Sequence, residues 1–249
     1  MAEIVSVHSF RGGTGKSNLT ANLAALAAAS GRKAALIDTD ISSPGVHVLF
    51  GLGPPTVTMA LNDYLWGRCG VDAIAYPQTL PGGQTLHVVP ASLNTEDIAR
   101  ILREGYDVER LTDGFRELIA HLGLDVLFVD THPGLNEETL LSMAVSDVLL
   151  LVLRPDQQDY LGTAVTVEVA RRLGVPRLQM LVNKTPSTFD FASVRDRVAE
   201  TYGADVVGVL PHSDELMALA SEGVFVLRHP DHPLTGTLRR IAERVVFRG

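Results

Sequence analysis

Residues 9–17, near the N-terminus, combine glycines, a lysine and a hydroxyl group in an order suited to holding a phosphate. Glycine adopts backbone angles that other residues resist, so successive N–H groups can converge on one anionic oxygen. Lys16 adds a mobile positive charge, and the Ser17 hydroxyl can join the coordination of Mg²⁺. Phe10 stands where the usual G-x-x-x-x-G-K-[ST] pattern has its first glycine. We predict a phosphate-binding loop, with a plain strand-to-helix turn as the alternative; it reads Ser9-Phe10-Arg11-Gly12-Gly13-Thr14-Gly15-Lys16-Ser17.

Three aspartates follow apolar runs and suit the hydrolysis of a bound triphosphate. Phosphoryl transfer to water needs a water in line with the γ-phosphate and a metal that neutralises charge on the oxygens. Asp38 and Asp40 are one residue apart, so in an extended chain both side chains face the same side. Asp130 ends a hydrophobic run, as does an acid that holds Mg²⁺ directly or through water. A turn or helix cap is the alternative for Asp38 and Asp40.

The elements that must position these residues are short apolar runs alternating with helical patterns. Most runs are continuously apolar, which is typical of parallel strands buried on both faces. Residues 17–29 and 160–173 have helical patterns, and residues 51–83 are the least regular part. We predict an α/β fold in one domain over residues 1–249, with a single doubly wound, mostly parallel sheet of about seven or eight strands and helices on both faces. The expected strands span residues 3–9, 33–38, 85–90, 125–130, 147–153, 177–183 and 205–210.

The composition excludes several classes of protein. With 46% hydrophobic and 20% charged residues, the 249-residue chain is not of the disordered type. Its apolar stretches are shorter than the roughly 20 residues of a membrane span, and the N-terminus lacks a secretory signal pattern, so we expect a cytoplasmic protein. The net charge of −8 restricts any binding to nucleic acid or anionic lipid to a local patch. Cys69 is the single cysteine, which excludes an intrachain disulfide and a cysteine-only metal site within one chain.

The sequence resembles a known family of ATPases. Residues 11–17, Arg-Gly-Gly-Thr-Gly-Lys-Ser, are similar to the deviant Walker A sequence K-G-G-x-G-K-[ST] of the ParA/MinD family. Residues 36–40 resemble its second motif, residues 128–134 its D-T-x-P-G switch segment, and residues 181–184 and 209–211 its base-recognition segments. These matches cover most of the chain in the family's order. The resemblance implies the P-loop NTPase fold, ATP and Mg²⁺ as ligands, and a homodimer when ATP is bound.

The resemblance also implies roles for individual residues. Lys16 would act on the phosphates, Asp40 would position the attacking water, and Asp38 would hold the Mg²⁺ shell. The family's signature lysine, which reaches the partner's nucleotide in the ATP-bound dimer, is replaced by Arg11. A guanidinium keeps the charge and offers a planar fork for phosphate oxygens, but it is bulkier. Arg11 could therefore act across the dimer, or bind its own loop or solvent.

Two strand ends and the switch segment carry further candidates. The Asn183 amide can pair with an adenine edge and Pro211 can pack on the ring, although a turn residue and a strand stop explain them as well. Gly134 can serve as a pivot for a loop that responds to the γ-phosphate. His132 is a conceivable general base, but the resemblance assigns it no role, and we expect an exposed loop histidine.

The C-terminal residues 234–249 have an amphipathic helical pattern with arginines on one face. Phe247 and the arginines could bind a lipid surface, as in MinD-like members with a basic C-terminal helix, but packing of the apolar stripe on the sheet is the favoured interpretation. Arginine pairs such as Arg171 and Arg172 could bind DNA only if the fold gathered them. The resemblance implies a surface such as nucleoid DNA or membrane, and a protein that stimulates hydrolysis.

Three functions are compatible with these residues. The leading hypothesis is an ATPase switch of the ParA/MinD type that positions a cellular structure or cargo. The second is a maturation or metal-insertion ATPase on the same scaffold, although His229 and His232 form a short pair that favours a surface loop over a metal site. The third is a low-turnover protein that senses ATP, which the replacement by Arg11 keeps open.

Overall fold

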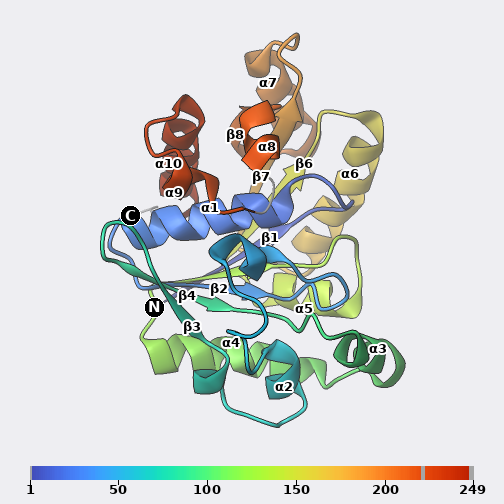
Figure 1. Ribbon diagram of the computed structural model, residues 1–249. Coiled ribbons are helices and arrows are strands. Elements are labelled where there is room, and N and C mark those ends of the chain that lie inside the picture. The colour runs from blue at the N-terminus through green and yellow to red at the C-terminus, as the bar shows by residue number, and fades with distance from the viewer. Residues whose placement is uncertain (1, 220–221, 247–249) are drawn as a thin grey trace.

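An eight-stranded sheet with helices against both faces forms the centre of the chain (Figure 1). The computed structural model describes residues 2–219 and 222–246. The strand order is β3-β4-β2-β5-β1-β6-β7-β8, and all neighbours are parallel except β3 and β4. This confirms the predicted α/β fold with a mostly parallel sheet. The strands are β1 (Glu3–His8), β2 (Ala34–Asp38), β3 (Tyr76–Thr79), β4 (Thr85–Val89), β5 (Val126–Asp130), β6 (Val148–Leu153), β7 (Arg177–Thr185) and β8 (Asp205–Pro211).

The central strands are apolar on both sides because helices cover both faces of the sheet. Every residue of β2, β5 and β6 is buried. Each of the predicted apolar runs coincides with one strand, and β7 and β8 extend past the predicted ends to Thr185 and Pro211. The strand that was not predicted, β3, lies within residues 51–83, the region that had no clear helical or strand pattern. It is a short antiparallel edge strand that contains Pro77, and edge positions tolerate proline because one side of the strand is unpaired.

The helices divide between the two faces. The first face carries α1 (Lys16–Ala29), α9 (Phe225–Arg228) and α10 (Pro233–Val246), whose apolar residues form one core cluster with the sheet. The opposite face carries α2 (Leu61–Leu65), α4 (Val108–Leu122), α5 (Glu137–Ala144), α6 (Gln157–Arg172) and α7 (Phe191–Tyr202). The remaining helices are α3 (Thr95–Glu104), α8 (Asp214–Leu219) and the 3-10 turns Val46–Phe50 and Val71–Ala73.

The C-terminal helix α10 packs its apolar stripe inward against α1 and β8. Leu238, Ile241 and Val245 are buried, as favoured from the sequence. The Arg244 guanidinium binds Asp205 Oδ1 at 2.7 Å and lies 3.1 Å from two carbonyl oxygens of β8. Phe247 and Arg248, which the lipid-binding alternative invoked, lie outside the described residues. Within the described ranges, none of the helices has the length and apolarity needed to cross a bilayer.

Candidate active site

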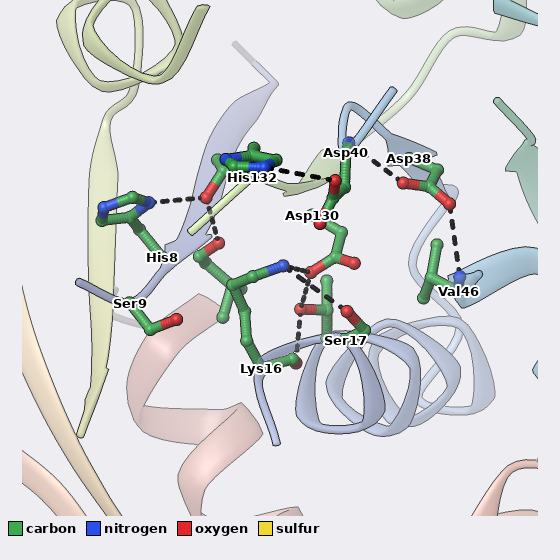
Figure 2. Close-up of polar contacts among 12 residues, drawn as sticks. His8, Ser9, Lys16, Ser17, Asp38, Asp40, Val46, Asp130 and His132 are labelled. Atoms are coloured by element: carbon green, nitrogen blue, oxygen red, sulfur yellow. Dashed lines mark hydrogen bonds and ion pairs between the residues drawn. The ribbon is translucent and has the colours of Figure 1, made fainter. Parts of the chain in front are cut away.

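The carboxyl ends of β1, β2 and β5 meet at one edge of the sheet, and the predicted loop and aspartates gather there (Figure 2). In the strand register, Asp130 lies opposite Asp38 on one side and Val7 on the other. Ligands of open α/β sheets bind beyond the carboxyl ends of strands, at the point where the strand order reverses. The topology thus brings together residues that are far apart in the sequence.

The loop between β1 and α1 encloses a cavity of about 290 Å³. Gly13 and Gly15 take positive φ angles of 80° and 89°, which turn successive N–H groups toward one point. No side chain caps the start of α1, so its first N–H groups are available to an anion. The Thr14 hydroxyl is buried without a hydrogen-bond partner among the described residues. This cradle fits a phosphate, and its lining is Ser9, residues 12–18, Asp40, Ser43 and Pro133.

A buried ion pair joins the phosphate loop to the end of β5. Lys16 Nζ lies 2.7 Å from Asp130 Oδ1, and the two side chains are 6% and 1% exposed. The Thr20 hydroxyl lies 3.1 Å from the same oxygen, and the Ser17 hydroxyl lies 3.4 Å from Nζ. Asp130 Oδ2 accepts no hydrogen bond from the described residues. This oxygen and the Ser17 hydroxyl oxygen are ligands of the type that Mg²⁺ prefers.

Asp38 and Asp40 do not face one cavity, contrary to the expectation from an extended chain. The strand β2 ends at Asp38, so the extended geometry that would place both side chains on one side does not continue to Asp40. Asp40 lines the phosphate cavity, where its Oδ1 accepts hydrogen bonds from Ser43 N at 3.1 Å and Ser43 Oγ at 2.9 Å. Nothing in the sequence pattern had singled out Ser43.

The Asp38 carboxylate is engaged by its own loop. Its Oδ2 accepts hydrogen bonds from Gly45 N at 2.9 Å and Val46 N at 3.2 Å, and lies 3.3 Å from His47 Nδ1. Complete burial raises the pKa of Asp38 above its ordinary value, and the hydrogen bond with His47 offsets only part of this increase. These bonds fold residues 39–47 around the end of β2. The assignment of Asp38 to the Mg²⁺ shell stays a prediction.

His8 ends β1 and is buried against the switch segment. Its Nδ1 lies 2.7 Å from Thr131 Oγ1, and that hydroxyl donates to the Val7 carbonyl at 3.0 Å. Since a hydroxyl has one proton, His8 Nδ1 is the donor of the first bond. His8 Nε2 has no hydrogen-bond partner among the described residues. Burial, with a smaller contribution from the Lys16 charge, lowers the pKa of His8 to about 3.

The depressed pKa of His8 predicts acid sensitivity of the fold. The unfolded histidine takes up a proton below about pH 6.5, whereas the folded one resists it, so the stabilisation is complete above pH 6.5 and is lost as the pH falls toward 3. Between pH 7.5 and 5.0 the wild type should lose about 2 kcal/mol more unfolding free energy than His8→Asn. Urea unfolding at both pH values measures this difference, and equal losses in the two proteins would contradict the linkage.

The switch segment between β5 and α5 is anchored to the phosphate loop. Gly134 takes a φ of 86°, and its N–H donates to the Ser9 carbonyl at 3.0 Å. His132 is half-buried rather than exposed, and its Nε2 faces Asp40 Oδ1 at 3.9 Å (Figure 2). The expectation of an exposed loop histidine was therefore wrong, because the turn at Gly134 folds the segment back over the cavity.

Asn183 and Pro211 do not line a common cavity. The Asn183 amide donates to the Thr14 carbonyl at 2.8 Å, and Lys184 Nζ donates to the Gly13 carbonyl at 2.9 Å. Both residues at the end of β7 therefore support the phosphate loop. Pro211 lines a separate cavity of about 220 Å³ with His212 and residues of α8 and α10. Contact of Asn183 and Pro211 with adenine stays a prediction.

Arg11 is held by the start of α6. Its Nη1 donates to Gln158 Oε1 at 2.6 Å and lies 3.5 Å from Asp159 Oδ1. Phe10 packs beside it on Gly162, where a Cβ atom would come within 1.9 Å of the ring. Arg11, the arginine at the signature position, therefore binds a neighbouring helix and does not bind its own loop.

The histidine pair near the C-terminus has a packing role. The rings of His229 and His232 lie 4.9 Å and 5.2 Å from the ring of Phe225, measured between centroids. His232 Nδ1 accepts a hydrogen bond from Leu234 N at 3.1 Å near the start of α10. Across residues 2–219 and 222–246, no three His, Cys, Asp or Glu side chains are grouped so as to hold a metal ion.

Comparisons with known proteins agree with this geometry. A family model described as "ParA: NUBPL iron-transfer P-loop NTPase" matches residues 1–246. An uncharacterized ATP-binding protein of Methanocaldococcus jannaschii is 27% identical over 247 residues, covering 99% of this chain and 88% of the relative. An iron-sulfur cluster carrier protein of Saccharolobus solfataricus is 26% identical over 258 residues, with 97% and 82% covered. The solved septum site-determining protein MinD of Pyrococcus horikoshii, complexed with Mg-ADP, has the same fold, with a TM-score of 0.84, 20% identity, and 98% and 96% covered.

Proposed function

The chain belongs to the ParA/MinD family of P-loop ATPases, and from this premise we propose that it is an ATP-hydrolysing switch that dimerises when ATP is bound. The relatives include an iron-sulfur cluster carrier, while the solved structures with this fold include a septum site-determining protein, so membership of the family assigns no single role. The observation that carries the proposal is the uncapped start of α1 beneath a glycine loop, with Lys16 and Asp130 paired at its base. A cradle of this kind binds the phosphates of a nucleotide.

The residues of the cradle have distinct tasks in hydrolysis. Backbone N–H groups of residues 12–17 and the Lys16 ammonium bind the phosphate oxygens. Ser17 and Asp130, and by the family resemblance also Asp38, would hold Mg²⁺, which would neutralise charge on those oxygens when bound. Asp40 faces the cavity and orients the attacking water by accepting its hydrogen bond.

The proposal is tested by turnover and association of the full chain. Release of phosphate from ATP with Mg²⁺ and sedimentation with ATP or ADP are measured side by side. We expect slow hydrolysis and a dimer that forms with ATP but not with ADP. Binding of ATP without hydrolysis would support the third hypothesis, a low-turnover protein that senses ATP. A chain that neither hydrolyses ATP nor dimerises with it would contradict the proposed switch.

Arg11 is proposed to act across that dimer after leaving α6. The Arg11→Ala substitution should weaken ATP-dependent dimerisation by about tenfold, since a charge-assisted contact is lost. The matched Gln158→Leu substitution removes the amide acceptor on α6 and should strengthen dimerisation a few-fold, because Arg11 then costs less to release. Dissociation constants from sedimentation measure both. Dimerisation of Arg11→Ala at the wild-type level would leave Arg11 as a support of α6 only.

The proposed dimer would position a cellular structure or cargo on a surface, with a partner protein that stimulates hydrolysis. Nucleoid DNA and membrane are the two candidate surfaces. Several surface arginines are already paired, including Arg172 with Glu168 and Arg177 with Glu3, so a DNA patch would have to draw on other groups or break these pairs. Co-sedimentation of the ATP-bound protein with DNA or with anionic liposomes distinguishes the two surfaces.

A second candidate function is nucleotide-dependent transfer of a metal cluster, which the description of the matching family model favours. The cluster would be cargo, and Cys69 is the one thiol of each chain. Burial raises the pKa of the Cys69 thiol, which disfavours the thiolate that binds metals. Anaerobic reconstitution with iron and sulfide, followed by metal analysis, tests this function, and stable iron that is lost in Cys69→Ser would support it.

A further inference from the structure

His132 sits in the switch segment with each ring nitrogen facing a different polar group. Its Nε2 lies 3.9 Å from Asp40 Oδ1 (Figure 2). Its Nδ1 lies 3.4 Å from Asn136 Nδ2. The side chain is 31% exposed, and the ring lies between Asp40 and Asn136 at the start of α5. The resemblance to the family gives no role to this position.

The cap of α5 determines which nitrogen of His132 carries the proton. Asn136 Oδ1 accepts a hydrogen bond from Thr139 N at 2.9 Å, and this bond fixes the orientation of the amide. Asn136 Nδ2, which is only a donor, therefore faces His132 Nδ1. Nδ1 must accept, so the proton of the neutral ring is on Nε2, the nitrogen that faces Asp40.

The two oxygens of Asp40 have unequal surroundings. Oδ1 accepts two hydrogen bonds from Ser43 and lies 3.9 Å from His132 Nε2, which is just beyond hydrogen-bond distance. Oδ2 has no hydrogen bond from any described residue. Ser43 therefore holds the carboxylate through one oxygen, which His132 Nε2 also faces, and the second oxygen is left to a group inside the cavity.

We propose that His132 is a positioning residue for Asp40: when the nucleotide is bound, the contact from His132 Nε2 shortens to a hydrogen bond that holds Oδ1, so that Oδ2 receives the attacking water. This inference rests on the proposed hydrolysis of ATP at the same site. Ser43 holds Asp40 from the β2 side, and the bond from His132 would hold it from the switch segment, which would tie the orientation of Asp40 to the position of that segment. Asn136 keeps the ring in the required tautomer.

Turnover of His132 variants tests the proposal. We expect His132→Leu to lower kcat about tenfold with the KM for ATP nearly unchanged, because one donor to a charged group is lost. His132→Gln places an amide donor near the position of Nε2 and should retain most of the wild-type kcat. In an Asp40→Asn background, His132→Leu should cause no further loss, since its effect passes through the carboxylate. Equal kcat of His132→Leu and wild type, or additive losses in the double variant, would overturn the proposal.

The tautomer is measured without any turnover. Long-range ¹⁵N–¹H spectra of the wild type should show His132 protonated on Nε2, and a ring protonated on Nδ1 would overturn the argument. Asn136→Ser retains an N-cap for α5 but removes the amide, so it should give a mixture of tautomers and a partial loss of kcat. A wild type that shows no hydrolysis overturns the proposed function, and with it the role of His132, whichever tautomer is found. A wild type that hydrolyses ATP while His132→Leu is fully active overturns the positioning role alone.

Discussion

The Lys16→Met substitution is expected to weaken ATP binding by about a hundredfold, because two or more charge-assisted contacts to phosphate oxygens are lost. The same change removes the partner of Asp130, a carboxylate that is 1% exposed. An unpaired buried charge costs about 3 kcal/mol, so we also expect lower stability. Calorimetric titration with ATP and urea unfolding measure the two effects in one preparation.

A matched double variant separates binding from stability. Adding Asp130→Asn to Lys16→Met removes the unpaired charge while keeping an amide that can accept from the Thr20 hydroxyl. We expect most of the lost unfolding free energy to return, with ATP binding still weak. A double variant as unstable as Lys16→Met would show that the buried carboxylate is not the cause. Affinity of Lys16→Met for ATP at the wild-type level would contradict the phosphate site itself.

The Asp40→Asn substitution is expected to lower kcat by roughly two orders of magnitude, because an amide oxygen orients and polarises water less than a carboxylate does. The amide still accepts from Ser43, so the loop should stay folded and ATP should still bind. Hydrolysis ends the ATP-bound state in the proposed switch. The variant should therefore remain dimeric with ATP for much longer than the wild type.

Ser43→Ala is the matched control for Asp40. It removes the hydroxyl donor at 2.9 Å but keeps the backbone donor at 3.1 Å, so the loss in kcat should be only a few-fold. Single-turnover hydrolysis and sedimentation over time measure both variants. Wild-type turnover by Asp40→Asn, or its failure to dimerise with ATP, would contradict the assigned role.

The features that depend on local sequence were predictable. The glycines of residues 12–15 permit the positive φ angles that a phosphate loop uses, and Gly13 and Gly15 adopt them. Continuous apolar runs require burial on both faces, so the strands that end at Asp38 and Asp130 could be placed from sequence and then proved neighbours in the sheet. The edge strand β3 was not predicted, because four residues that include a proline carry no periodic signal.

The contacts that set the chemistry of the site belong to the tertiary structure. The spacing of Asp38 and Asp40 predicted that both side chains face the same side, yet Asp40 lines the cavity while donors of its own loop surround Asp38. Arg11 meets Gln158, and His132 meets Asp40, only because separate strands end at one edge of the sheet.

Spacing along the chain therefore determined which residue types could bind phosphate and metal, and which strands would carry them. It could not determine how each side chain is held, because hydrogen bonds reach only about 3 Å and their partners come from loops far apart in sequence. Those loops become neighbours when the parallel strands assemble. The orientation of Asp40, the tautomer of His132 and the anchoring of Arg11 were decided at that step.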